Sequence, residues 1–284
     1  MSVEMVDAGA LTTVQDLGRP GWAHLGVPRA GALDGPAAAL ANRLVGNPVD
    51  AAVLETTMTG CTLKAGRAHW VAVTGASCAV LVDGHSVGYA VPVWLQAGAM
   101  LVVGPAETGV RSYVAVAGGV DVEPVLGSRS TDILAGVGPP ALKAGDVVPV
   151  GGRGGEPQPH DTPRLPVDGP LRLLPGPRAD WFAPDPVVAL CVGSYAVGPE
   201  SNRIGVRLVG EPLLRAPERV GTELLSEPLV LGAVQIPPNG QPVVFLADHP
   251  VTGGYPVAAV VHPDDLWRCA QARPGDTVRF SLWS

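Results

Sequence analysis

The sequence predicts a mainly β protein with a few short helices. Glycine and proline are abundant, with 37 and 30 residues among 284, and they are spread along the chain. Short apolar runs separate them, a spacing typical of many short strands joined by turns. The expected strands lie at 70–73, 79–82, 111–116, 171–174, 228–231, 242–247 and 277–280.

Two segments predict helices. Residues 34–46 open with a capping Asp, have a Pro in the first turn and close on Gly, the usual end signals of a helix. Residues 263–271 carry two acids in their first turn, and a Pro-Gly pair follows the segment. Acids favour a helix N-terminus, and Pro-Gly ends a helix. We expect two to four short helices in all.

The segment 151–163 is the main break in composition. It contains no aliphatic residue and is rich in Gly and Pro, so we interpret it as a linker. A glycine-rich cradle for an anion is the alternative. The break predicts an N-terminal β-rich domain at 1–155 and a C-terminal β-barrel domain at 156–284. Two strand-rich halves of this size suggest two related β barrels.

Composition argues against several classes of partner. The chain is 46% hydrophobic and only 16% charged, with a net charge of −7. Nucleic acid and anionic membranes both call for a basic surface, so neither is expected as a partner. No apolar run approaches the roughly 20 residues that span a bilayer. The acidic start lacks the regions of a signal peptide, so a cytoplasmic location is expected.

Cysteine, histidine and lysine usage limits the available chemistry. The four cysteines form no Cys-x-x-Cys pair and the six histidines form no zinc-binding pattern, so we expect reduced thiols and no metal site. The only lysines are Lys64 and Lys143, so there is no P-loop lysine motif. Neither lysine is flanked by Met, as a biotin-attachment lysine is. ATP or biotin chemistry therefore needs another architecture or a partner chain.

The most informative polar segment follows the apolar run 242–247. Asp248 comes first, and Thr252, Gly253, Gly254 and Tyr255 follow shortly after. Adjacent glycines let backbone N–H groups approach a ligand closely, because no Cβ intervenes. The alternative is a hairpin turn with a packed Tyr.

Other polar groups interrupt apolar stretches and are candidates for binding. They are Arg29 in a glycine-rich loop, Asn42 on the first helix, Glu55 in a Val/Leu/Thr strand, the run Ser201-Asn202-Arg203, Glu223, and Gln235 in a later strand. A buried carboxylate or amide needs partners, and Arg can hold a carboxylate or phosphate through two hydrogen bonds. Structural alternatives stay open: a solvated Arg29, an outward-facing Glu55, a turn at 200–204 and a structurally satisfied Gln235.

Taken in order, five motifs carry a family resemblance. They lie at 12–21, 26–34, 41–47, 201–208 and 252–256. Together they resemble the biotin-dependent carboxyltransferase-like family, which includes the C subunit of 5-oxoprolinase, KipA, allophanate hydrolase subunit 2 and the carboxyltransferase region of urea carboxylase. The resemblance runs from about Met5 to Phe280.

The resemblance implies cyclophilin-like β-barrel domains and a partner, the 5-oxoprolinase B subunit or a KipI-like protein. In 5-oxoprolinase members, the A, B and C subunits together convert 5-oxo-L-proline to L-glutamate with ATP. That predicts an ATP-dependent lactam hydrolase subunit that shares its nucleotide with its partners and is inactive without them. The alternatives are a urea carboxylase-like subunit, receiving carboxyl from biotin on another protein, and a KipA-like regulator that binds a kinase inhibitor.

Roles for the candidate residues follow from their chemistry. Arg29 and Arg203 are predicted to stabilise a phosphoryl charge, and Asp248, Glu55 or Glu223 to orient a metal or activate water. The predicted small-molecule binding residues are Asn42, Ser201, Asn202, Gln235, Thr252, Gly253, Gly254 and Tyr255. One departure concerns the last motif, where Pro250 and Val251 stand in place of the Gln and Thr expected for the family. The loss of an amide and a hydroxyl points to altered substrate choice or a weaker site.

Overall fold

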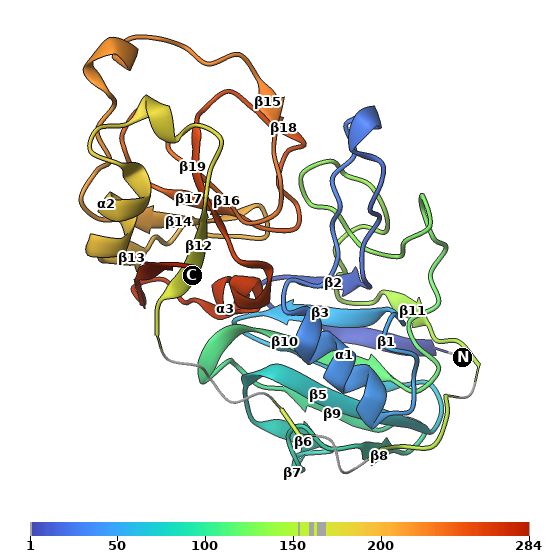
Figure 1. Ribbon diagram of the computed structural model, residues 1–284. Helices are drawn as coiled ribbons and strands as arrows, with labels where there is room; N and C mark the ends of the chain where they lie inside the picture. Colours follow the sequence, from blue (N-terminus) through green and yellow to red (C-terminus); the bar gives the residue numbers. More distant parts are fainter. Residues whose placement is uncertain (1, 153, 159–161, 164–168, 284) are drawn as a thin grey trace. The chain divides into compact units, whose positions relative to one another are not determined.

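The structure is a computed structural model, which describes residues 2–152, 154–158, 162–163 and 169–283 (Figure 1). Two compact units form, one from Met1–Arg19 and Ala30–Leu165 and the other from Pro20–Arg29 and Pro166–Ser284. The sequence predicted a division between residues 155 and 156. The two predicted domains, 1–155 and 156–284, stay a prediction.

Unit 1 consists of two antiparallel sheets that enclose one core. The first sheet has the order β11 (Val147–Pro149), β1 (Ser2–Asp7), β4 (Cys61–Ala65), β9 (Met100–Val103), β6 (Val80–Val82) and β7 (His85–Ser86). The second has the order β2 (Thr12–Gln15), β3 (Val53–Thr57), β10 (Thr108–Val116), β5 (His69–Ser77) and β8 (Val93–Leu95).

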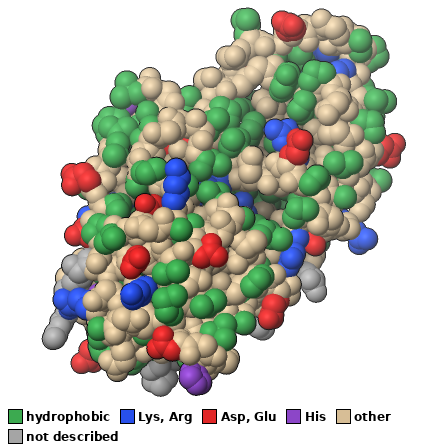
Figure 2. All heavy atoms as spheres, turned by 180° about the vertical axis from the view of Figure 1, so that it is seen from behind, with side chains coloured by type: hydrophobic (Ala, Val, Ile, Leu, Met, Phe, Trp, Pro, Cys, Tyr) green, Lys and Arg blue, Asp and Glu red, His purple; other side chains and the backbone are tan. Residues whose placement is uncertain are grey.

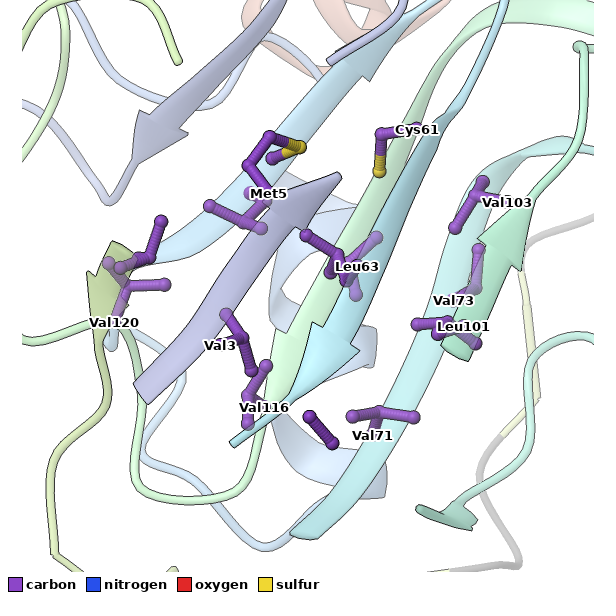
Figure 3. Packing of buried hydrophobic residues seen from close by; sticks show 14 of the residues in the cluster. Val3, Met5, Cys61, Leu63, Val71, Val73, Leu101, Val103, Val116 and Val120 are labelled. Atoms are coloured by element: carbon purple, nitrogen blue, oxygen red, sulfur yellow. The ribbon is translucent and has the colours of Figure 1, made fainter. Parts of the chain in front are cut away.

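Alternation along the strands builds the core of unit 1. Met5 and Leu63 on the first sheet point toward Val71 and Val73 on the second (Figure 3). Ala72, between those two valines, faces the other way and packs with the residues of α1 (Gly35–Leu44). Both faces of β5 are therefore buried, which explains its nearly continuous apolar sequence.

Helix α1 covers the outer face of the second sheet, against β10 and β5 (Figure 1). The side chain of Asp34 accepts a hydrogen bond from the backbone N–H of Ala37 at 3.0 Å, as an N-cap does. Proline fits in the first turn because a backbone N–H at that position would have no acceptor within the helix. The helix predicted at 34–46 is confirmed.

Unit 2 is built on one eight-stranded sheet. Its order is β20 (Thr277–Val278), β13 (Tyr195–Val197), β14 (Gly205–Val209), β17 (Val243–Phe245), β16 (Ala233–Gln235), β19 (Val257–Val261), β12 (Leu171–Pro175) and β21 (Phe280–Leu282). The two outermost strands, β20 and β21, are separated in the chain by Arg279 alone. A sheet whose two edges meet at one residue must curl back on itself, so the sheet is a nearly closed β barrel.

Smaller elements complete unit 2. A separate two-stranded ribbon pairs β15 (Glu227–Pro228) with β18 (Thr252–Gly253). The remaining helices are α2 (Pro186–Val192), α3 (Leu266–Gln271) and the short 3₁₀ turns η1 (Ala23–Leu25), η2 (Ala179–Trp181), η3 (Pro217–Arg219) and η4 (Pro263–Asp265). The predicted helix at 263–271 is confirmed, as η4 followed by α3.

Two strand predictions need correction. Of the run 228–231, only Pro228 lies in a strand, because the chain turns at Leu231 and Gly232 before β16. The run 277–280 is divided between β20 and β21. Helix α2 was not predicted, although Asp185 caps it and a Pro opens it. The other expected strands are confirmed to within one or two residues at most ends, apart from longer extensions of β5 and β10.

The segment predicted as a linker is in part tied to unit 1. The N–H of Gly155 donates to the carbonyl of Gly46 at 2.8 Å, and that of Gln158 to Leu44 at 3.1 Å. Residues 153 and 159–161 of this segment lie outside the described part of the chain.

On the face shown in Figure 2, Lys and Arg side chains stand apart from one another rather than merging into a basic patch.

Candidate functional site

A buried ion pair lies at the centre of the predicted site in unit 2. Asp248 follows β17 and Arg203 precedes β14, and the two strands are paired side by side. The Arg203 guanidinium donates from Nε to Oδ2 of Asp248 at 3.0 Å and from Nη2 to Oδ1 at 2.9 Å. The side chains are 1% and 0% exposed. Residues 45 positions apart are thus joined because their strands are neighbours.

The neighbours of Arg203 shape the turn that delivers it. Ser201 donates its hydroxyl to the carbonyl of Gly198 at 2.8 Å and accepts from the N–H of Arg207 at 3.0 Å. The side-chain oxygen of Asn202 accepts from the N–H of Ile204 at 2.8 Å. Both side chains therefore satisfy backbone groups of the turn, which is the structural alternative that the sequence left open for this segment. Their predicted role in substrate binding remains a prediction.

The glycine loop lies on the two-stranded ribbon of unit 2. Glu227 pairs with Gly253, and Pro228 with Thr252. Thr252 and Tyr255 are exposed. The alternative of a hairpin turn with a packed Tyr is not what the structure shows, because Thr252 and Gly253 form a strand, a bend follows and Tyr255 is exposed.

Gln235 holds the end of this loop. Its side-chain N–H donates to the carbonyl of Tyr255 at 2.9 Å. A Cβ built on Gly253 would lie 2.7 Å from the amide nitrogen of Gln235 and 2.8 Å from a methyl of Leu229. Position 253 thus needs a glycine for close packing, although its φ is not in the left-handed region. Gln235 is buried and structurally satisfied, and a role in binding a ligand amide stays a prediction.

Three residues beside the loop were not predicted as site residues. His249 is 6% exposed, its Nδ1 lies 2.7 Å from the carbonyl of Pro250, and its ring lies 6.1 Å from that of Phe245. Arg178 donates through Nε to Glu227 at 2.9 Å, and its Nη2 contacts the other carboxylate oxygen. This hydrogen bonding lowers the pKa of Glu227. The position of His249 directly after Asp248 was a usable signal, whereas no sequence spacing links Arg178 to Glu227.

Glu55 is buried in unit 1 among donors. Its Oε2 accepts from the N–H of Leu33 at 3.0 Å and from the hydroxyl of Tyr113 at 2.8 Å, and Nε of Arg111 lies 3.7 Å from Oε1. The same Tyr113 hydroxyl accepts from the N–H of Asp34 at 2.7 Å. Burial, with Glu55 adding to it, raises the pKa of Tyr113 well above its ordinary value. Glu55 is thus not an outward-facing strand residue.

Asn42 ties the end of α1 to the loop before β3. Its amide donates to the carbonyl of Ala51 at 2.7 Å and its oxygen accepts from Asn47 at 3.1 Å. Asn47 in turn donates to the carbonyl of Val116 at 2.9 Å and accepts from the N–H of Gly118 at 2.8 Å. These bonds are structural, and substrate binding by Asn42 is not tested by them.

The motif at 12–21 also organises unit 1. Asp16 accepts from the hydroxyls of Ser128 and Ser130, each at 2.6 Å, and from the N–H of Arg129 at 2.6 Å. Arg19 is 1% exposed and contacts the carbonyl of Ser130. The polar side chains of this motif therefore bind the loop at 16–19 to the loop at 128–130. Arg29, by contrast, is exposed.

The cavities of the described residues lie apart from the predicted site, and these residues form no metal-ligand cluster. Two cavities, of about 250 and 620 Å³, have linings that include none of the predicted site residues. Within 2–152, 154–158, 162–163 and 169–283, no group of three or more His, Cys, Asp or Glu side chains is placed to hold a metal ion. Over the same residues, no helix has both the length and the apolar character needed to cross a bilayer.

A nearly closed barrel with a buried Arg–Asp pair and a glycine loop defines the class of protein. The chain belongs to the carboxyltransferase domain family, subdomains A and B, whose model matches residues 25–282. The resemblance drawn from the five motifs is thereby confirmed. Within the family, the chain is 39% identical to the 5-oxoprolinase C subunit of Escherichia coli (strain K12), over 98% of this chain and 90% of that protein.

Two solved structures show the same fold. The crystal structure of TTHA0988 has a TM-score of 0.88 and 40% identity and covers 99% of this chain, which spans 55% of that one. The Kluyveromyces lactis urea amidolyase has a TM-score of 0.93 and 31% identity and covers the whole of this chain, which spans 19% of that one. The chain thus corresponds to about half of TTHA0988 and to a smaller part of urea amidolyase.

Proposed function

We propose that this chain is the C subunit of an ATP-dependent 5-oxoprolinase, which opens the lactam of 5-oxo-L-proline to L-glutamate together with partner subunits. The observation that carries the proposal is the 39% identity to the Escherichia coli 5-oxoprolinase C subunit, which extends over nearly the whole of both chains. As an ATP-consuming system, it is proposed to act in the cytoplasm.

The proposed reaction requires a polar site that binds the lactam and a supply of ATP that drives its hydrolysis. One water adds across the lactam C–N bond, and hydrolysis of ATP to ADP and phosphate drives the overall conversion. The lactam presents a carboxylate, a carbonyl and an N–H. Thr252 and Tyr255 are exposed residues, and hydroxyl groups and adjacent glycine backbone are suited to bind such groups. Binding of this kind orients the substrate for attack.

The two predicted charge stabilisers differ in availability. Arg203 is buried and shares two hydrogen bonds with Asp248, whereas Arg29 is exposed and fits an anionic group. We propose that Arg29 contacts the anionic substrate or phosphate, and that Arg203 and Asp248 hold the loop in place. Because the chain has no P-loop lysine motif, the partner subunits are proposed to contribute most of the nucleotide site.

A second candidate is carboxyl transfer in a urea carboxylase-like system. The TM-score of 0.93 to urea amidolyase favours it. Biotin would then arrive on another protein, because neither Lys64 nor Lys143 is flanked by Met. We rank this second because the identity to urea amidolyase is 31%, against 39% to the 5-oxoprolinase protein.

The test is reconstitution. The chain is co-expressed with its candidate A and B partner subunits, and release of glutamate and ADP from 5-oxo-L-proline and ATP is followed. Arg29→Ala is the informative variant, because an exposed side chain contributes little to folding. We expect turnover that requires this chain and falls about 100-fold in Arg29→Ala, within the range seen when one stabilising donor is lost. Glu200→Gln, at an exposed position of unit 2, serves as the control and should retain full turnover.

The other outcomes discriminate among the alternatives. A stable complex without glutamate release in any combination would reject the 5-oxoprolinase proposal. Carboxyl transfer from free biotin derivatives in the same preparation would then support the second candidate. Binding without either activity would favour a regulatory role.

A further inference from the structure

One arginine, Arg178, links the residue paired with Gly253 to the strand that follows the glycine loop at 252–255. Arg178 is itself placed by its backbone, because its N–H donates to the carbonyl of Val257 at 3.1 Å. Val257 opens β19 directly after the loop. The guanidinium of the same residue contacts both carboxylate oxygens of Glu227, and Glu227 pairs with Gly253. The strand partner of Gly253 and the strand after the loop are thus linked through a single residue.

The ribbon that carries the loop is short, and its other support comes from a few contacts such as the bond from Gln235 to Tyr255. It has two residues on each strand and does not join the eight-stranded sheet. A two-stranded ribbon of this length is marginal by itself. One further backbone bond extends it, from the N–H of Leu229 to the carbonyl of Val251 at 2.9 Å. Adjacent glycines at 253 and 254 add conformational freedom, so the loop needs outside contacts to keep one shape.

We propose that Arg178 is a positioning residue that, through Glu227, holds the Thr252–Tyr255 loop in its binding conformation for the lactam substrate. The reference to the lactam rests on the proposed function, whereas the clamping of the loop does not. Arg178 and Glu227 are 36% and 30% exposed, so their pair is worth little to global stability. The Arg178–Glu227 pair instead stabilises the conformation of the Thr252–Tyr255 loop.

Hydrogen exchange tests the clamp without any assumption about activity. In Arg178→Gln and in Glu227→Gln, we expect the backbone amides of residues 253–255 to exchange about 10-fold faster, as a loop does when its local opening becomes easier. The double variant should exchange no faster than either single variant, because both changes break the same link. Global unfolding by urea should remain nearly unchanged.

The matched control is Arg172→Gln. Arg172 also holds a carboxylate through two hydrogen bonds, to Asp265 at 2.9 Å each, and is 38% exposed. Asp265 lies beyond the other end of β19, so exchange at 253–255 should stay at the wild-type rate. Unchanged exchange in the two single clamp variants, or a multiplied effect in the double variant, would overturn the proposal.

Kinetics with the reconstituted complex supply the functional readout. We expect the KM for 5-oxo-L-proline to rise about 10-fold in Arg178→Gln, as a misplaced binding group predicts. The KM for ATP should be unchanged, which separates a loop effect from a general disturbance of the complex. Arg178→Lys retains the charge and should recover part of the loss. If the wild-type complex shows no turnover while loop exchange responds as expected, the proposed function fails and the clamp stands.

Discussion

Arg203 and Asp248 share two hydrogen bonds, at 3.0 and 2.9 Å, in a position where neither side chain exposes more than 1% of its surface. The pair joins the start of β14 to the end of β17. Two charges removed from water in this way depend on each other, because either one alone would lose the two charge-assisted hydrogen bonds that offset its desolvation cost.

We therefore predict that Asp248→Asn lowers the free energy of unfolding by about 3–5 kcal/mol, the usual cost of removing one charge of a buried ion pair. Urea denaturation measures the change. The exposed Glu200 provides the control, since Glu200→Gln should shift stability by no more than about 0.5 kcal/mol. The Arg203→Leu, Asp248→Leu double variant should be more stable than Asp248→Asn. A milder loss in the single variant would contradict this account of the pair.

The two glycines of the loop should respond differently to alanine. In Gly253→Ala the new methyl would lie 2.7 Å from the Gln235 amide and must displace it from the carbonyl of Tyr255. We expect a loss of about 1–3 kcal/mol for this overpacking. In Gly254→Ala the nearest atom, the carbonyl oxygen of Leu224, is 3.3 Å away, so the loss should be smaller. Thermal unfolding of both variants tests the order, and equal losses would refute it.

Tyr113→Phe isolates the hydrogen bonds around Glu55. The change removes the donor to Glu55 at 2.8 Å and the acceptor for the N–H of Asp34 at 2.7 Å, while the ring stays in the core. Leaving buried polar groups unsatisfied costs about 1–3 kcal/mol, and we expect a loss of that size in urea unfolding. Tyr89→Phe is the comparison and should lose less, because the Tyr89 hydroxyl donates to a backbone carbonyl, that of Gly75 at 2.6 Å, rather than to a buried carboxylate.

Stability should fall at high pH through two buried thiols. Burial raises the pKa of Cys61 and of Cys269 from 9.0 to about 12. Between pH 9 and 12 the unfolded chain loses these protons while the folded chain keeps them. The free energy of unfolding therefore decreases, by at most about 1.4 kcal/mol per pH unit for each thiol.

Urea unfolding between pH 8 and pH 10.5 measures this slope. Cys61→Ala lowers stability at all pH values by leaving a cavity, but it should make the decline with pH shallower. Cys191→Ala is the control, because Cys191 is only partly buried and should change the slope less. A slope unaffected by Cys61→Ala would argue that other groups, such as the buried tyrosines, account for the decline.

Local signals predicted most of the fold. Asp34 and the proline after Gly35 marked the start of α1, and apolar runs bounded by turn residues marked β5, β10 and β12. Helix α2 was missed because a seven-residue helix has too little periodicity to separate it from a buried strand. Pro228–Leu231 was mistaken for a strand because it is a short apolar run followed by a turn residue, Gly232. An apolar loop that leads into a turn has the same sequence pattern.

The sequence predicted candidate site residues, whose roles stay predictions, but it did not predict how they pair. The sequence singled out Arg203, Asp248 and Glu55, each as a group that could meet a ligand. Their partners come from strands that are distant in the chain, as with Glu55 on β3 and Tyr113 on β10. Register across a sheet decides such contacts, and a single sequence without the sheet order does not contain that information.

The closure of the unit 2 barrel also bears on how it folds during synthesis. Its first strand, β12, pairs in parallel with β21, so Leu171 meets Phe280 only after nearly the whole unit has left the ribosome. Until then the edges of β12 and β13 are open, and open strand edges can pair with other chains. We expect this unit to depend on chaperones that cover these edges until Phe280 has emerged, because contacts so distant in sequence form late.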